Sequence, residues 1–216
     1  MPKLTYGETA AREVSERFAA PQATLTALKA IPANQRVNGM SAIVLADGSR
    51  WRFSSTSALT GDDLLVAAPS AGSGRWLREV GATTLAIPIT YATADAAALL
   101  TLQAGMLIRW TGFAWKVTAD FTGGSSSAIG VSSAKTGYTT KGDLLGGATG
   151  DVAATLVASS GLGVDGTIGA KFGTDALRRA LWAAADTLRF DRITSAFTAG
   201  TGYVLASCEI LNNDGA

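Results

Sequence analysis

Short apolar runs separated by glycine, aspartate and proline dominate the chain, and many of them alternate with a period of two residues. In GMSAIVLADGSRWRFSS, residues 39–55, two such runs flank Asp47-Gly48. An Asp-Gly pair between β-forming residues predicts a hairpin, because a tight primed turn needs the positive φ that these residues tolerate. Trp51 and Phe53 are two residues apart, so they share one face of the second strand.

The segments around this hairpin predict a small β-module. Residues 64–68 form an apolar run typical of a buried strand, residues 69–74 are rich in turn formers, and residues 75–77, Arg-Trp-Leu, predict the last strand. A short helix is expected before the hairpin, at residues 24–30, and Ile31-Pro32 ends it.

A weaker version of the pattern returns in residues 94–120, where a short helical run, a strand, a turn at Thr111-Gly112 and a second strand are expected. Three residues of the first hairpin recur 64 positions later, from 48 to 112, which suggests an internal duplication. Gly48, Trp51 and Phe53 correspond to Gly112, Trp115 and Val117.

The composition changes beyond this second pattern. Residues 123–137, GGSSSAIGVSSAKTG, resemble a linker because they are too polar and too small to build a core. Residues 174–188 place leucines at helical spacing and predict a helix, whereas residues 202–211 predict a strand followed by a frayed tail.

These patterns predict a mainly β protein with short helices, a β-rich α+β chain built from small β-hairpin modules. Five parts are expected: an N-terminal arm or helix (1–23), a β-module (24–80), a second and weaker β-module (81–122), a Gly/Ser linker (123–137) and a C-terminal β/α packing unit (138–216).

The composition excludes several classes of partner. Of the 216 residues, 47% are hydrophobic and 16% are charged, and 25 are glycine, which fits short elements joined by many turns. Lys and Arg number 18 against 17 for Asp and Glu, so a net charge of +1 provides no field to attract nucleic acid or a membrane surface. We expect neither as a partner. The chain shows no signal-peptide core and no bilayer-length apolar stretch, so synthesis in a cytoplasm is expected.

The sequence offers no recognisable catalytic, cofactor or metal site, and we expect no enzyme. The absence of histidine removes the common triads and imidazole metal sites. Cys208 is the single cysteine and is expected to be a buried apolar residue. Asp62 and Asp63 are adjacent, so nothing holds them at the separation of a catalytic acid and base, and a solvated turn is expected. The glycine-rich residues 141–150 lack phosphate-loop spacing.

Large aromatic residues are the candidates for packing. Most of the five tryptophans lie in runs with alternating apolar neighbours, which favours a core or a subunit interface over an exposed sugar-binding platform. The packing and interface candidates are Trp51, Phe53, Trp76, Trp110, Trp115 and Trp182.

The order of features in residues 24–79 resembles a small module of tailed-bacteriophage fibre, tailspike and head-fibre proteins. The residues that carry it are Asp47-Gly48, Trp51-x-Phe53, Asp62-Asp63, Pro69 and Gly74-Arg75-Trp76. In addition, TTKGDLLGGATGDVAATL, residues 139–156, is similar to a Thr-Thr-Lys-Gly-Asp-Leu-Leu stretch that recurs in phage fibre shafts and connectors. The two segments together cover under half of the chain.

The resemblance implies a non-enzymatic virion structural protein, made in the bacterial host cytoplasm: a short fibre or fibre-anchoring protein at the neck, tail or head, or else a capsid decoration protein. It also implies a homotrimer, with portal or neck, tail or capsid proteins as further partners and a host surface glycan as another candidate. By the same resemblance, the paired acids belong to a turn and Gly-Arg-Trp ends the module. The alternatives from other classes are a carbohydrate-binding module and, last, a hydrolase whose acids come from distant positions such as Asp120 and Asp143.

Overall fold

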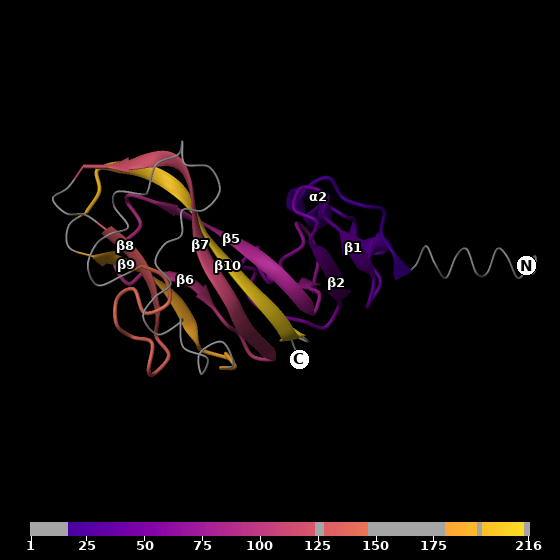
Figure 1. Ribbon diagram of the computed structural model, residues 1–216. Helices are drawn as coiled ribbons and strands as arrows, with labels where there is room; N and C mark the ends of the chain where they lie inside the picture. The colour runs from indigo at the N-terminus through magenta and orange to yellow at the C-terminus, as the bar shows by residue number, and fades with distance from the viewer. Residues whose placement is uncertain (1–16, 124–127, 147–179, 194–195, 214–216) are drawn as a thin grey trace, which may run out of the picture. The chain divides into compact units, whose positions relative to one another are not determined.

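Three antiparallel sheets form the described part of the chain in a computed structural model, which describes residues 17–123, 128–146, 180–193 and 196–213 (Figure 1). The mainly β prediction with short helices is confirmed, with 49% strand and 6% helix. The chain divides into two compact units. The first contains the described residues up to Val80 together with Asn213, and the second is Gly81–Asn212.

A four-stranded sheet in the order β1-β2-β4-β3 forms the first unit with a short helix. The hairpin at Asp47-Gly48 is confirmed, because β1 and β2 pair antiparallel and Gly48 has a φ of +69° in the turn. The helix expected before it is also confirmed, since the Thr24 side chain accepts a hydrogen bond from the Ala27 N–H at its first turn. The elements are α2 (Leu25–Lys29), η1 (Ala33–Gln35), β1 (Ser41–Ile43), β2 (Arg50–Ser54), β3 (Val66–Ala67) and β4 (Arg75–Arg78).

The aromatic cluster of this unit lies on one face of the sheet. Trp51 and Phe53 alternate with exposed arginines along β2, and Trp76 lies beside Phe53 on β4 with its ring centroid 5.2 Å away. Leu28 of α2 packs in the same cluster of buried residues. Burial of these rings stabilises a unit too small to contain a large aliphatic core.

Two three-stranded sheets form the second unit, in the orders β5-β10-β7 and β6-β9-β8. Buried residues alternate with exposed or half-buried ones along β5 and β10, and the register places Leu85 opposite Ala206 and Ile87 opposite Val204. One face of the first sheet is therefore apolar and buried. The strands are β5 (Gly81–Thr90), β6 (Ala98–Thr101), β7 (Met106–Thr122), β8 (Ala128–Ser133), β9 (Thr187–Ile193) and β10 (Ala199–Asn213).

The turn expected at Thr111-Gly112 is wrong. Strand β7 runs for 17 residues straight through this position, beside the 15 residues of β10. Gly112 lies inside a strand, whereas Gly48 occupies a turn, so the proposed duplication does not correspond to equivalent structure. Hydrogen bonding along a long neighbour keeps β7 extended where a local pattern indicated a bend.

Two helical expectations in the second unit are also wrong. A short helix was expected at the start of residues 94–120. Strand β6 forms in this region instead, from Ala98 to Thr101. Residues 180–188 are not helical, because the Trp182 backbone exchanges hydrogen bonds of 2.8 and 2.9 Å with Ile108 and because β9 begins at Thr187. Residues 174–179 of that expected helix lie outside the described residues. Burial of Trp182 outweighs local helix propensity.

The second unit is organised differently from the expected modules. Residues 128–133, expected in a linker, form β8 and pair with β9. Residues 81–122 and 138–212 fall in one unit. This segment builds part of a core because Ile129 and Val131 of β8 are buried in the same sheet as Leu188 and Phe190 of β9. Most of the N-terminal arm or helix, residues 1–23, lies outside the described residues.

Replacing Trp76 by Ala should lower the free energy of unfolding of the first unit by about 3 to 5 kcal/mol, because the fully buried ring leaves a large cavity. Chemical denaturation followed by tryptophan fluorescence measures this change. Replacing the exposed Leu45 by Ala is the matched control and should change the midpoint little. An unchanged midpoint in the Trp76→Ala variant would show that this ring does not stabilise the unit.

Candidate functional site

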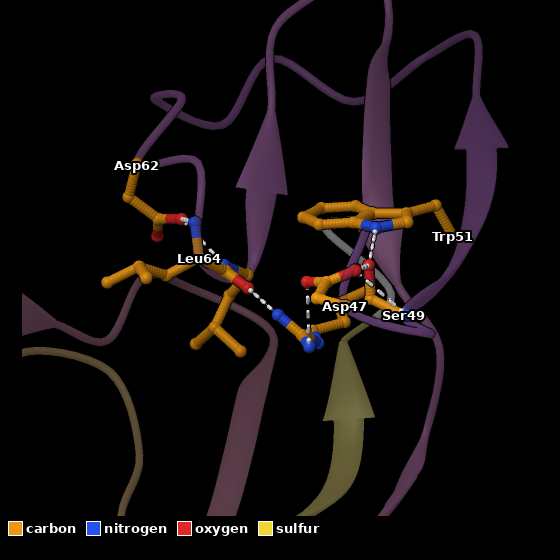
Figure 2. Close-up of polar contacts among 7 residues, drawn as sticks. Asp47, Ser49, Trp51, Asp62 and Leu64 are labelled. Carbon is orange, nitrogen blue, oxygen red and sulfur yellow. Dashed lines mark hydrogen bonds and ion pairs between the residues drawn. The ribbon is translucent and has the colours of Figure 1, made fainter. Parts of the chain in front are cut away.

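A chain of polar contacts runs through the first unit, and it begins in the β1–β2 turn (Figure 2). Asp47 Oδ1 accepts hydrogen bonds from the Ser49 backbone N–H at 3.0 Å and from its hydroxyl at 2.6 Å. The Ser49 hydroxyl oxygen in turn accepts the indole N–H of Trp51 at 2.7 Å. An Asp side chain that bonds two residues ahead holds the turn and places the acceptor that a buried indole needs.

Arg78, a buried residue of β4, extends this chain of contacts. Its guanidinium donates to the Leu64 carbonyl oxygen at 3.1 Å and lies 3.7 Å from Asp47 Oδ2. The same group lies 5.7 Å from the centroid of the Trp51 ring. A buried guanidinium requires acceptors and a counter-charge, and Asp47 and Leu64 provide them from two different loops.

Asp62 holds the loop that precedes β3. Its Oδ1 accepts the backbone N–H groups of three successive residues, Leu64, Leu65 and Val66, at 2.7–2.9 Å. The expected solvated turn is therefore corrected for Asp62, which is half-buried and positions the backbone. Asp63 is exposed, has a φ of +57° and forms an ion pair with Lys29 Nζ at 2.8 Å.

Asn213, at the end of β10, closes the first unit. Its side-chain amide donates to the Leu65 carbonyl oxygen at 3.1 Å and to the Arg78 carbonyl oxygen at 3.0 Å, and the residue is buried. The expectation of a frayed tail from residue 212 is therefore wrong at Asn213. The Leu65 carbonyl oxygen also accepts the Arg78 N–H at 2.9 Å, so the Asn213 side chain reinforces a contact that already joins the segments of β3 and β4.

The polar contacts of this chain hold backbone segments of the first unit in place. Both oxygens of Asp47 and Oδ1 of Asp62 contact a turn amide, a hydroxyl or the Arg78 guanidinium, so these carboxylates position main chain and aromatic rings. In the described ranges no three His, Cys, Asp or Glu side chains are grouped in a way that could hold a metal ion. The arrangement is suited to rigidity.

A second polar cluster lies under residues 140–143 in the second unit. Asp191 of β9 is 3% exposed and accepts the Ser132 hydroxyl at 2.7 Å and the Gly142 N–H at 2.9 Å. Burial raises the pKa of the Asp191 carboxyl, and the nearby Asp95 charge adds to this, against the two hydrogen bonds and the Lys141 charge.

Lys141 anchors the same segment from its other side. Its ammonium lies 2.6 Å from Asp95 Oδ2 and also donates to the Arg192 carbonyl oxygen. Asp143 Oδ2 accepts the Thr140 N–H at 2.9 Å and shapes the turn. Lys141 and Gly142 of the Thr-Thr-Lys-Gly-Asp stretch thus attach this segment to β9, and Thr140 and Asp143 bond to each other within its turn.

An apolar groove of about 390 Å³ lies along β1 in the first unit. Phe18, Pro21 and Ile43 contribute its apolar surface, and Arg50 and Glu79 its charged groups. The segment around Phe18 pairs in parallel with β1, and the Phe18 side chain is 62% exposed.

The structure buries all six aromatic candidates at 0–4% exposure, and it separates them into two groups. Trp51, Phe53 and Trp76 belong to the first unit. In the second unit, Trp110 and Trp182 meet edge to face at 6.3 Å. The five tryptophans are all described and all buried, so they form no exposed platform for a sugar. The candidates and their places are Trp51 and Phe53 on β2, Trp76 on β4, Trp110 and Trp115 on β7, and Trp182 before β9.

No protein-family model, no curated protein and no solved structure matches this chain. In addition, none of the helices in the described ranges has the length and apolar character needed to cross a bilayer.

Three structurally important residues were missed in the sequence. Arg78 follows Trp76 by two positions, so the strand period alone places it on the buried face and could have identified it. Asp191 is an acid in the middle of a strand, which is a weak signal of a buried partner. Asn213 has no local signal, because its partners lie more than 130 residues away.

Replacing Asp62 by Ala should lower the free energy of unfolding of the first unit by about 2 kcal/mol, because three backbone N–H groups lose a charged acceptor. Asp62→Asn keeps one acceptor oxygen and should cost less. Asp63→Asn, on the exposed neighbour, keeps a residue type that tolerates positive φ and should change stability by about 0.5 kcal/mol or less. Equal effects of Asp62→Ala and Asp63→Asn in urea titrations would contradict the special role of Asp62.

Replacing Asp191 by Asn should change how stability depends on pH. The raised pKa of Asp191 means that the folded state binds this proton more tightly than the unfolded state does, so its stabilisation is present at low pH and is lost as pH rises through the folded-state value. Asn cannot ionise, so the variant should gain stability relative to the wild type as pH increases above the ordinary Asp value of 3.8. Urea unfolding across this range measures the difference, with the exposed Asp63→Asn as control. Parallel profiles for wild type and Asp191→Asn would show that burial does not perturb this carboxyl.

Proposed function

We propose that this chain is a non-enzymatic structural protein of a tailed-bacteriophage virion, and more specifically a short fibre or fibre-anchoring protein at the neck, tail or head. The observation that carries the proposal is the place of the motif residues. The features shared with phage fibre modules supply the core rings and turn contacts of one compact unit. A motif whose residues all serve one small fold is what a reusable attachment module requires.

Gly74 shows how closely the motif matches this fold. It has a φ of +84°, and a Cβ atom built on it would lie 2.6 Å from the Phe53 ring. Any larger residue would therefore displace the ring that packs on Trp76, besides straining the backbone. The Gly-Arg-Trp sequence at this point is explained by the contact between β2 and β4 and needs no catalytic role.

The second shared stretch supports the same proposal. Lys141 and Gly142 attach a turn to β9, and Asp143 shapes that turn. The first phage-like segment and the described part of the second, residues 139–146, thus have a structural explanation, whereas residues 147–156 lie outside the described residues. Proteins that transmit load or fix neighbours in a particle depend on such rigid, β-rich units and act by packing against other chains.

The proposal is tested by following the tagged chain in cells infected with the phage that encodes it. We expect the chain to co-sediment with purified particles through a density gradient, and gold-labelled antibody to mark one position on them, at the neck, tail or head. The free chain mixed with finished particles that lack it is the control for adhesion. A chain that stays at the top of the gradient during infection would overturn the virion proposal.

A further inference from the structure

Strand β5 forms one edge of the β5-β10-β7 sheet, and its sequence is unusual for an edge. Its ten residues, GATTLAIPIT, carry no charge. Exposed edge strands commonly carry lysine, other charges or a bulge, because their free backbone groups otherwise pair with another chain. Here only Pro88 interrupts the edge.

The direction of each backbone group of β5 follows from one hydrogen bond. The Tyr91 N–H donates to the Gly200 carbonyl oxygen at 2.9 Å, and the register continues this pairing with Ile89 opposite Gly202 and Ile87 opposite Val204. Because hydrogen-bonded pairs alternate along an antiparallel ladder, odd-numbered residues of β5 bond to β10 and even-numbered residues direct their N–H and C=O groups outward.

Two further observations agree with this assignment. The Thr90 N–H bonds outside the ladder, to Thr93 Oγ1 at 2.9 Å. Pro88 is also even-numbered, and its missing N–H would break the sheet if it faced β10. The outward groups of Ala82, Thr84 and Ala86 have no partner in the part of the chain that the structure describes, and all three residues are exposed.

We propose that β5 pairs antiparallel with β5 of a second copy of this chain, centred on Thr84. In this register Thr84 lies opposite itself and Ala82 lies opposite Ala86, since the numbers of each pair add up to 168. Each of these residues supplies one outward donor and one outward acceptor, so every pair forms two hydrogen bonds. Pro88 would fall opposite residue 80, beyond the end of the strand.

The second copy is the occupant that the edge itself favours. The three outward-facing positions carry only methyl and hydroxyl groups, so self-pairing brings no like charges together and no large side chains into conflict. The two sheets would join as one continuous six-stranded sheet, in the order β7-β10-β5-β5-β10-β7, and the contact would be isologous.

This inference does not depend on the virion proposal. A two-fold contact closes at two copies, so it predicts a dimer of two times 22.0 kDa, about 44 kDa, where the phage resemblance implies a trimer of about 66 kDa. Light scattering on a sizing column separates the two. A mass of 44 kDa supports the β5 pairing, whereas a monomer at all concentrations or a trimer overturns it. The sedimentation test with particles is unaffected by either result.

Cysteine cross-linking tests the register directly. Opposed residues of a hydrogen-bonded pair have Cα atoms about 5.5 Å apart, within disulfide reach, so Thr84→Cys should form a covalent dimer under mild oxidation. Ala86→Cys is the matched control on the same face, because two copies of residue 86 would be four positions apart along the strands, about 13 Å. Cys208 is buried. Equal cross-linking of both variants, or none of Thr84→Cys, would overturn the register.

Removing an outward donor tests the edge itself. Ala86→Pro deletes an N–H that does not bond to β10, and Ala86→Val changes the side chain while keeping that N–H. We expect the proline variant to weaken the dimer about ten-fold or more and the valine variant to retain it.

If the proline variant folds poorly, amide hydrogen exchange in the wild type tests the same pairing. The amides of Ala82, Thr84 and Ala86 should be protected at high concentration and exchange fast on dilution, whereas those of Leu85 and Ile87, bonded to β10, stay protected at both. Fast exchange of the even-numbered amides at every concentration would overturn the proposal.

Discussion

A guanidinium that leaves water must find acceptors, and in the first unit this requirement links segments that are distant in the sequence. Arg78 reaches Leu64 before β3 and Asp47 in the β1–β2 turn, while its guanidinium lies near the ring of Trp51. The backbone of the same residue is fixed by Asn213. Removal of Asp47 or Asn213 takes a polar partner away from the buried residue Arg78, so the aromatic core and the polar chain stabilise each other.

Much of the first unit could be predicted because its signals are local. The Asp47-Gly48 turn and the Thr24 cap act within a few residues of the structure that they specify. The second unit was harder, because its strands are defined by partners far along the chain. The local pattern at Thr111-Gly112 indicated a turn, but pairing with β10 keeps this position in a strand. The local pattern of residues 180–188 indicated a helix, but Trp182 pairs with Ile108.

The candidate site shows the same division. Burial of the aromatic candidates follows from their alternation with polar neighbours, whereas the role of Asp62 depends on three amides that only a particular loop geometry brings to one oxygen. The residues of the phage-like motif are therefore best explained by the contacts that the first unit needs in order to fold. The motif does not determine which other chain packs against the folded units. The uncharged edge of β5 is the feature that best indicates such a partner.

Asn213 also affects the order of events during synthesis. It lies 148 residues after Leu65, whose carbonyl oxygen it binds, so the first unit lacks one of its contacts until all of the second unit has been translated. A contact of such long sequence separation forms late in folding. Chains interrupted in the second unit would therefore present an unfinished first unit, and quality-control proteases could distinguish them from complete ones.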